Sequence, residues 1–306
     1  MIQNTNNKHV YCFGEVLWDI FPEGKKAGGA PFNVAYNLKQ MGINSHMISR
    51  VGFDTLGNEL LNKVKGWGIP ETEIQIDNSK PTGTVIATID NQNEAHYDIV
   101  EQVAWDFIEC RDNYKEKLQT ATAFIFGSLI TRHQTSYNTL LALIEIAPYK
   151  VFDINIRMPY FDFNKVNELL KKSNVVKMNK AELKTIINLL DKTYYNEKDS
   201  VQFIHEHYSL DEVIITKGSK GALYMNNKDY YSVSALPVTI ADTVGSGDAF
   251  LAGFISKKIT GGTPLEAVKQ GIDLGAFITS NHGACPDYTM EDFNNFLKTT
   301  TQRFSL

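Results

Sequence analysis

The sequence predicts a single α/β domain built on a mostly parallel β-sheet with covering helices, and three observations lead to this fold class. The first seventy residues alternate strand, helix, strand and helix patterns, which is typical of a parallel sheet. The same alternation resumes after about residue 105. A chain of 306 residues, 43% of them hydrophobic, can bury a large core, and no repeat, low-complexity tract or linker divides it. We therefore expect one domain over residues 1–306.

The N-terminal part supplies two strand–helix pairs. An apolar run with β-branched and aromatic residues, VYCFGEVLWDIF over residues 10–21, predicts the first strand. Residues 28–42 predict the first helix, because Pro31 suits a first helical turn and Gly42 a C-terminal end. The next pair consists of a strand in SHMISRVG (45–52) and a helix in LGNELLNKVKGWG (56–68).

A segment from about Pro81 to Trp105 interrupts this alternation. Residues 82–100 contain two β-rich runs around a polar turn, which predicts a hairpin. A hairpin inserted into a strand–helix series is a candidate lid, and we expect the lid to comprise residues 15–32 and 81–105. The exposed face of a lid hairpin usually needs cover, so we also predict a homodimer formed through the lid.

Strand and helix patterns alternate again in the second half of the chain. Strands are predicted in AFIFGSLI (123–130), KVFDINI (150–156), VVKMN (175–179) and DEVIITKG (211–218). Helices are predicted between them in QTSYNTLLALIEIA (134–147) and FNKVNELLKK (163–172). GALYMNNKDYYSVSA (221–235) predicts a second hairpin, and the remainder is mostly helical.

Composition and charge exclude several classes of function. The net charge of −5 gives no reason to expect a nucleic-acid or membrane-surface partner. The polar N-terminus has no apolar stretch of signal-peptide length, and the apolar segment 121–130 is too short to span a membrane. Cys12, Cys110 and Cys285 are too few and too widely spaced for a disulfide framework or a zinc site. We therefore expect a cytoplasmic protein.

The stretch ADTVGSGDAFLAG, residues 241–253, places a carboxylate where a small flexible loop turns into a helix. A helix N-terminus binds anions, and Gly245, Ser246 and Gly247 bring its N–H groups close to a phosphate. Asp248 falls in the first turn, where the partial positive charge of the helix N-terminus favours the ionised carboxylate. An ionised carboxylate is suited to act as the base that takes a proton from a hydroxyl. The alternative to a phosphate site is that the glycines form only a tight turn and that Asp248 is an ordinary carboxylate at the N-terminus of a helix. The G-x-x-x-x-G-K-[ST] loop and the protein-kinase motifs are absent from the sequence.

The same stretch resembles the signature D-T-x-G-A-G-D-x-F of the ribokinase-like carbohydrate kinases, the PfkB family. GGAPFNVAYNLKQMG and VGFDTLGNELL resemble the N-terminal signatures of that family, and PTGTV, KMNKAEL and ITKGSKGA follow in family order. The resemblance covers roughly residues 10–290. It implies a three-layer α/β/α fold with a small β lid, and transfer of the ATP γ-phosphate to a sugar hydroxyl.

The resemblance also implies roles for individual residues. Asp248 is the general base, and the N–H groups of Gly245, Ser246 and Gly247 bind the transferring phosphate. The residues that hold the sugar hydroxyls are Asp19, Gly28, Gly29 and Asn33. Arg157 contacts either the γ-phosphate or the substrate.

Nucleotide and cation sites follow from the same resemblance. Asn179 and Glu182 organise Mg²⁺ near the triphosphate, although NKAEL also predicts an ordinary helix cap. The nucleotide-binding loop comprises Thr216, Lys217, Gly218 and Gly221, with Lys217 as either a phosphate contact or an exposed charge at a strand end. A monovalent-cation site, for K⁺, comprises Asp242 and the carbonyls of Val244, Ile278, Asn281 and Gly283.

Among family members, CFGEVLWDIFP, GGAPFNVA, VAWDFI and DINIR look most like fructokinases. Leu17 stands where ribose kinases commonly carry Asn, which counts against ribose. Phe32 either packs under the helix, which we favour, or narrows the sugar pocket, and Trp105 and Tyr97 either stack on the sugar or pack across a lid dimer. The alternatives are a kinase for 2-keto-3-deoxygluconate, tagatose, ribose or a nucleoside, and a non-catalytic sugar- or nucleotide-binding protein.

Overall fold

A computed structural model describes residues 8–89 and 95–303 of the chain. The strands of its large sheet are β1 (His9–Phe13), β4 (Asn44–Gly52), β5 (Ile74–Asp77), β8 (Ala123–Gly127), β9 (Lys150–Asp153), β10 (Val175–Asn179), β11 (Glu212–Thr216), β12 (Ala222–Asn226) and β13 (Tyr230–Val233). Their order is β13-β12-β11-β10-β9-β8-β1-β4-β5. Neighbours from β11 to β5 are parallel, whereas β12 and β13 form an antiparallel hairpin at the edge. The predicted parallel sheet and the second hairpin are confirmed.

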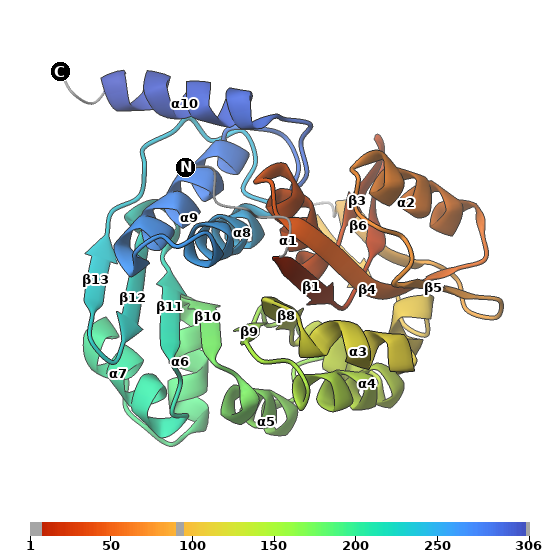
Figure 1. Ribbon diagram of the computed structural model, residues 1–306, viewed down its shortest axis with the longest axis horizontal. Coiled ribbons are helices and arrows are strands. Elements are labelled where there is room, and N and C mark those ends of the chain that lie inside the picture. The colour runs from red at the N-terminus through yellow and green to blue at the C-terminus, as the bar shows by residue number, and fades with distance from the viewer. Residues whose placement is uncertain (1–7, 90–94, 304–306) are drawn as a thin grey trace.

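Helices cover both faces of this sheet. The described helices are α1 (Ala30–Gln40), α2 (Thr55–Gly66), α3 (Asp112–Gln119), α4 (Gln134–Ile144), α5 (Phe163–Lys172), α6 (Lys180–Leu189), α7 (Glu197–His207), α8 (Ser246–Ile259), α9 (Pro264–Thr279) and α10 (Met290–Arg303). Figure 1 shows α8, α9 and α10 above the sheet and α3 to α7 below it. The fold is thus the three-layer α/β/α arrangement that the resemblance implied.

Side-chain alternation along the strands explains why both faces need cover. In β1, Val10 and Cys12 pack with residues of α1, α8 and α9, whereas Tyr11 and Phe13 pack with residues of α3 to α7. Successive side chains of a strand point to opposite faces, so an apolar run such as β1 is stable only between two layers. None of the described helices is both long and apolar enough to cross a membrane.

A smaller sheet stands beside the large one. Its strands are β2 (Leu17–Phe21), β3 (Gly24–Gly28), β6 (Gly83–Ile89) and β7 (Ala95–Ile99), in the order β3-β2-β6-β7. The antiparallel pair β6–β7 confirms the predicted hairpin, whose turn at residues 90–94 lies outside the described residues. The small sheet is narrower than the predicted lid of residues 15–32 and 81–105. Residues 30–32 belong to α1, and Trp105 lies in the 3₁₀ turn η2 (Ala104–Phe107). We propose residues 17–28, 83–89 and 95–99 as the described part of the lid.

The single strand predicted over residues 10–21 was wrong, because this run forms β1 and β2 in different sheets. β1 pairs with β4 and β8, whereas β2 pairs with β3 and β6. The chain turns at Gly14, whose φ of +145° favours glycine, and a Cβ there would lie 2.8 Å from the Pro31 ring. The segment 14–16 therefore carries the chain from the large sheet into the small one.

The order of the strands in the large sheet also indicates where a ligand is expected to bind in this class of fold. From β1 the chain first builds β4 and β5 on one side, and later β8 to β11 on the other side. In open α/β sheets, ligands bind beyond the carboxyl ends of the strands where the order reverses. Residues 14–16 follow β1 at that point.

Candidate active site

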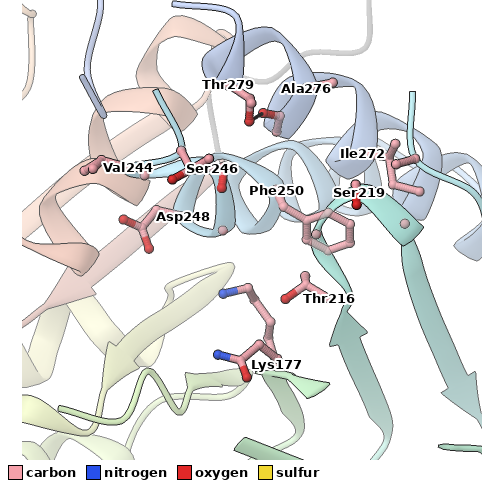
Figure 2. A pocket seen from close by; sticks show the side chains of 18 of the residues that line it. Lys177, Thr216, Ser219, Val244, Ser246, Asp248, Phe250, Ile272, Ala276 and Thr279 are labelled. Carbon is pink, nitrogen blue, oxygen red and sulfur yellow. Dashed lines mark hydrogen bonds between the residues drawn. The ribbon is translucent and has the colours of Figure 1, made fainter. Parts of the chain in front are cut away.

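A cavity of about 770 Å³ lies beyond the carboxyl ends of β9, β10 and β11, beside the N-terminus of α8. It brings together much of the predicted site: Arg157, Asn179, Glu182, Thr216, Gly218, Gly221, Val244, Gly245, Ser246, Gly247 and Asp248. Figure 2 shows Lys177 extending from β10 toward the first turn of α8, where Asp248 points back toward the strands. Residues from four separate parts of the chain therefore share one cavity.

The glycine loop at the start of α8 has a backbone that only glycine adopts readily. Gly245 is the N-cap residue, with φ +75°, and no side chain caps the helix there. A Cβ at Gly245 would lie 2.3 Å from the Ala284 Cβ, so larger residues do not fit. The loop and the partial positive charge of the helix N-terminus together form an anion site on the cavity wall.

Asp248 lies in the first turn of α8, partly buried, and faces both the cavity and α1. Its Oδ2 accepts a hydrogen bond of 2.8 Å from Asn33 Nδ2. We expected the partial positive charge of the helix N-terminus to favour the ionised carboxylate. Burial has the larger effect and raises the pKa of Asp248 to about 6, although Lys177 and the Asn33 hydrogen bond lower that pKa. Asp248 is still mostly ionised near pH 7.5, with a basicity suited to accepting a proton.

The sequence reasoning missed a buried ion pair on the floor of the cavity. Lys177 Nζ lies 2.7 Å from Asp153 Oδ2, and the two side chains are 8% and 6% exposed. Burial alone would lower the pKa of Lys177, but the charges of Asp153 and Asp248 together raise it, so the ammonium stays protonated. Lys177 Nζ is also 3.3 Å from where a Cβ of Gly247 would be. A fixed positive charge therefore lies under the glycine loop.

A sequence signal for this pair existed. Lys177 interrupts the apolar run VVKMN, and Asp153 ends the apolar run KVFD. A charge within a buried strand needs a partner, so these two residues on adjacent strands were candidates for an ion pair at the carboxyl ends. Deciding that they pair required the register, in which Lys177 is directly opposite Asp153.

The four predicted sugar contacts do not line this cavity, but they lie together on its α1 side. Asp19 on β2 packs over Gly28 on β3: a Cβ at Gly28 would be 2.3 Å from Asp19 Oδ2. Burial raises the pKa of Asp19 to about 6, while Arg157 and Lys26 lower it. Asn33 links this group to the base through Asp248 Oδ2.

Cys285 orients the Asn33 amide. Its Sγ donates a hydrogen bond of 3.3 Å to Asn33 Oδ1, and this contact fixes the other end of the amide, Nδ2, toward Asp248. The sequence reasoning had assigned no role to this cysteine. Cys12, Cys110 and Cys285 are all free thiols.

The other end of the cavity is apolar and suits a nucleobase. Thr216, Gly218 and Gly221, which we predicted to bind the nucleotide, line it near the end of β11. Further apolar side chains, which the sequence reasoning missed, come from the segment after β13 and from α8 and α9: Leu236, Val238, Ile240, Phe250 and Ile272. Lys217 is not an exposed charge at a strand end, because its Nζ lies 3.3 Å from Glu197 Oε2 and its side chain is 11% exposed. Its role as a phosphate contact stays a prediction.

Asn179 and Glu182 form the capping box that the sequence also allowed. Asn179 Oδ1 accepts the N–H groups of Ala181 and Glu182, and Glu182 Oε2 accepts the N–H of Asn179. Glu182 Oε1 accepts the N–H of Ile156. Within residues 8–89 and 95–303, no three His, Cys, Asp or Glu side chains are arranged to hold a metal ion.

Asp242 joins the two loops of the predicted monovalent-cation site. Its Oδ1 accepts the Val244 N–H at 3.0 Å, and its Oδ2 accepts the Gly283 N–H at 3.0 Å. The N–H groups of Ala241 and Asp242 also donate to the Thr279 carbonyl. Ile278 lies in the last turn of α9 and Asn281 in the loop that follows, and the Asn281 N–H donates to the Ile278 carbonyl. The five predicted residues are therefore close together, next to the glycine loop.

Two aromatic residues are explained by packing. Phe32 is fully buried, with its ring 5.1 Å from that of Trp67, as we favoured. The two roles predicted for Trp105 were wrong, because it is fully buried within one chain, with the Arg132 guanidinium 3.9 Å from its ring. Its neighbour Gly83 leaves no room for a Cβ, which would lie 2.4 Å from Trp105 Nε1. The Tyr97 side chain lies outside the described residues.

Comparison with known proteins gives a consistent result. A model of the pfkB family carbohydrate kinases matches residues 6–290. The fructokinase of Salmonella typhimurium is 26% identical over 297 residues, covering 91% of this chain and 95% of that protein. The crystal structure of a fructokinase from Vibrio cholerae O395, in its fructose, ADP and calcium ion bound form, has a TM-score of 0.80 at 22% identity and covers 96% of this chain and 100% of the other. A fructokinase from Xylella fastidiosa with bound ATP has a TM-score of 0.85 at 18% identity, covering 96% and 99%.

Proposed function

The chain belongs to the pfkB family of carbohydrate kinases and is an ATP-dependent sugar kinase, and we propose that its acceptor is fructose, phosphorylated on a primary hydroxyl. The observation that carries the site assignment is the 2.8 Å hydrogen bond between Asn33 and Asp248. It supports the assignment because the residue expected to hold the sugar touches the residue expected to act as the base. Similarity to fructokinases over most of the chain supports fructose, as does Leu17 at the start of β2.

In the proposed reaction, Asp248 accepts the proton of the sugar hydroxyl. The hydroxyl oxygen attacks the γ-phosphorus of ATP, the bond to the β-phosphate oxygen breaks, and ADP leaves. Asp19, Gly28, Gly29 and Asn33 orient the sugar. The lid sheet excludes water that would otherwise hydrolyse ATP.

Negative charge on the transferring phosphoryl group is proposed to be stabilised from two sides. The N–H groups of Gly245, Ser246 and Gly247 lie at the N-terminus of α8, and the Lys177 ammonium lies below the same loop. Donors that are already fixed in place need no reorganisation when the charge develops. Arg157, an exposed residue of the cavity wall, is a further candidate contact for the phosphate or the substrate.

The family implies Mg²⁺ bound with the nucleotide, and the residues present fit this ion. Mg²⁺ usually keeps several waters and takes one or two carboxylates together with substrate phosphates. Asp153 Oδ1 is buried with no hydrogen-bond partner among the described residues, and Asp153, Asn179 and Glu182 all line the cavity. We propose that these three residues hold the ion and its waters, where it would neutralise phosphate charge.

A monovalent cation, K⁺, is proposed between the loops that Asp242 joins. The proposed ligands are Asp242 and the carbonyls of Val244, Ile278, Asn281 and Gly283. Support comes from the hydrogen bonds of Asp242 to both loops, which hold these residues beside the glycine loop. A cation there would fix the loop that binds the phosphate.

We also propose a homodimer through the lid, supported by Ile86 on β6, which is 41% exposed.

ATP consumption by the purified protein, across a panel of acceptors, tests the proposed substrate. The panel comprises fructose, ribose, tagatose, 2-keto-3-deoxygluconate and adenosine, with Mg²⁺ and with K⁺ or Na⁺. We expect kcat/KM for fructose to exceed that for each other acceptor by about tenfold or more. Selectivity for the acidic acceptor would overturn fructose and point to Arg157 as its contact. An absence of turnover with every sugar would favour a non-catalytic protein on this fold.

A further inference from the structure

Helix α1, which carries Asn33, begins without a local cap. Its N-cap residue is Gly29, with φ +115°, and no side chain of the helix or its cap accepts an N–H group of the first turn. The first turn also contains no acidic residue. Helices normally begin with Ser, Thr, Asp or Asn at this position, because a side-chain oxygen satisfies free N–H groups there.

A local cap is excluded by the packing around Gly29. A Cβ on this residue would lie 2.3 Å from the Glu15 carbonyl oxygen, and its φ is one that other residues rarely adopt. The preceding residue, Gly28, has no room either, because its Cβ would lie 2.3 Å from Asp19 Oδ2. The backbone that faces the proposed sugar must therefore be glycine, and the cap must come from elsewhere in the chain.

Glu15 supplies that cap from the segment after β1. Its Oε1 accepts the N–H of Ala30, the first residue of α1, at 3.1 Å. The second residue of the helix, Pro31, has no N–H. Glu15 is only 4% exposed, and its Oε2 is buried with no hydrogen-bond partner among the described residues. Burial raises the pKa of the Glu15 carboxyl to about 7, while its backbone hydrogen bonds and Arg157 lower it. A buried carboxyl of this kind is costly and needs a reason.

The contact ties the proposed sugar site to the base. Glu15 accepts the Ala30 N–H, and the Asn33 N–H donates to the Gly29 carbonyl at 2.8 Å, so hydrogen bonds hold both ends of the first turn of α1. The Asn33 side chain on that turn reaches Asp248. We propose that Glu15 is a positioning residue, whose carboxyl group caps α1 in place of a local side chain and thereby fixes Gly28, Gly29 and Asn33 relative to Asp248. This inference rests on the proposed sugar site.

The test compares Glu15→Ala, Glu15→Gln and a matched cap variant, Thr263→Ala. Thr263 caps the N-terminus of α9 by accepting the Glu266 N–H, and it is exposed. The residues of α9 that line the cavity lie farther along the helix, from Ile272 to Thr279. We expect Glu15→Ala to raise KM for the sugar by about tenfold or more and to leave KM for ATP within about twofold. Glu15→Gln keeps an oxygen that can accept the Ala30 N–H, so its sugar KM should stay within about threefold of the original. Thr263→Ala should change neither KM.

Amide hydrogen exchange, measured without any ligand, separates this inference from the proposed function. Glu15→Ala should speed exchange in residues 29–33, whereas Thr263→Ala should speed it only at the start of α9. Unchanged exchange in residues 29–33, or equal rises of the KM for sugar and for ATP, would overturn the positioning role of Glu15. If the original protein phosphorylated no sugar, the proposed function would fail, and the exchange result would still decide whether Glu15 caps α1.

Discussion

Asn33 and Asp248 lie 215 residues apart in the sequence, and the Asn33 amide donates a 2.8 Å hydrogen bond to the Asp248 carboxylate. Cys285 holds the other end of the same amide through Asn33 Oδ1. The bond joins the start of α1 to the start of α8. A group expected to hold the sugar and a group expected to accept its proton are therefore in direct contact.

Replacing the base tests its role most directly. In Asp248→Asn the amide oxygen can still accept the Asn33 hydrogen bond, but it cannot take a proton from the sugar. We expect kcat to fall by about 10³-fold or more, with the sugar Kd within a few-fold of the original. Steady-state kinetics and calorimetric titration with the sugar give the two values. Full activity in this variant would contradict the proposed role of Asp248 as the base.

The same variant should be more stable than the original protein. Folding raises the pKa of Asp248 from 3.8 to about 6, so the neutral form is favoured in the folded state. The resulting stabilisation is complete below about pH 3.8 and is lost as the pH rises through about 6. At pH 7.5 the ionised carboxylate therefore opposes folding, and Asp248→Asn should raise the free energy of unfolding by about 1–2 kcal/mol after allowance for its partial exposure. Urea unfolding at pH 7.5 and at pH 4.5 measures this gain, which should shrink at the lower pH.

Activity should depend on pH through two carboxylates. Burial raises the pKa values of both Asp19 and Asp248 to about 6, and both are expected to act as ionised groups. We expect kcat/KM for the sugar to fall below pH 6 more steeply than tenfold per pH unit, since kcat/KM reports the free enzyme. In Asp19→Asn the fall should return to about tenfold per unit. Identical slopes for the two proteins would show that Asp19 does not contribute.

Lys177 should contribute to catalysis and not only to folding. Lys177→Met removes the charge below the glycine loop and leaves Asp153 buried without its partner. We expect kcat to fall by about 100-fold and the free energy of unfolding to fall by about 3–5 kcal/mol. The double variant Lys177→Met with Asp153→Asn removes the unpaired charge, so it should recover most of the stability. Its activity should stay low, because it lacks both the Lys177 charge and a carboxylate of the proposed Mg²⁺ site. Recovery of both would assign Lys177 a structural role alone.

The glycine loop should not tolerate a single methyl group. Gly245→Ala meets Ala284 and requires a positive φ, which we expect to cost about 2–4 kcal/mol of stability in total. The displaced loop should also lower kcat by about tenfold or more. Gly66→Ala is the matched control, because a Cβ there meets nothing within 4 Å. This control should raise the free energy of unfolding by about 0.5–1 kcal/mol and leave kcat unchanged.

Local patterns were sufficient for most elements of this fold. The period of the apolar residues, Pro31 at a helix start and Gly42 after a helix end predicted strands and helices that the structure contains. The run over residues 10–21 was misjudged because β1 and β2 are both apolar and only a single residue, Gly14, redirects the chain. Trp105 was misjudged for a related reason: whether an aromatic side chain is buried in the core or faces a ligand depends on neighbours far away in the sequence.

What the sequence by itself determined is the order of elements and the residue types of the site, because both depend on short-range chemistry. The loop Gly245–Ser246–Gly247 needs its glycines for backbone geometry, and Asp248 follows it in the first helical turn. Only the tertiary structure decided the pairing of Lys177 with Asp153, the bond from Asn33 to Asp248, and the cap that Glu15 gives to α1. These contacts, and the raised pKa of Asp248, arise from burial and from partners that are distant in sequence, which no local pattern encodes.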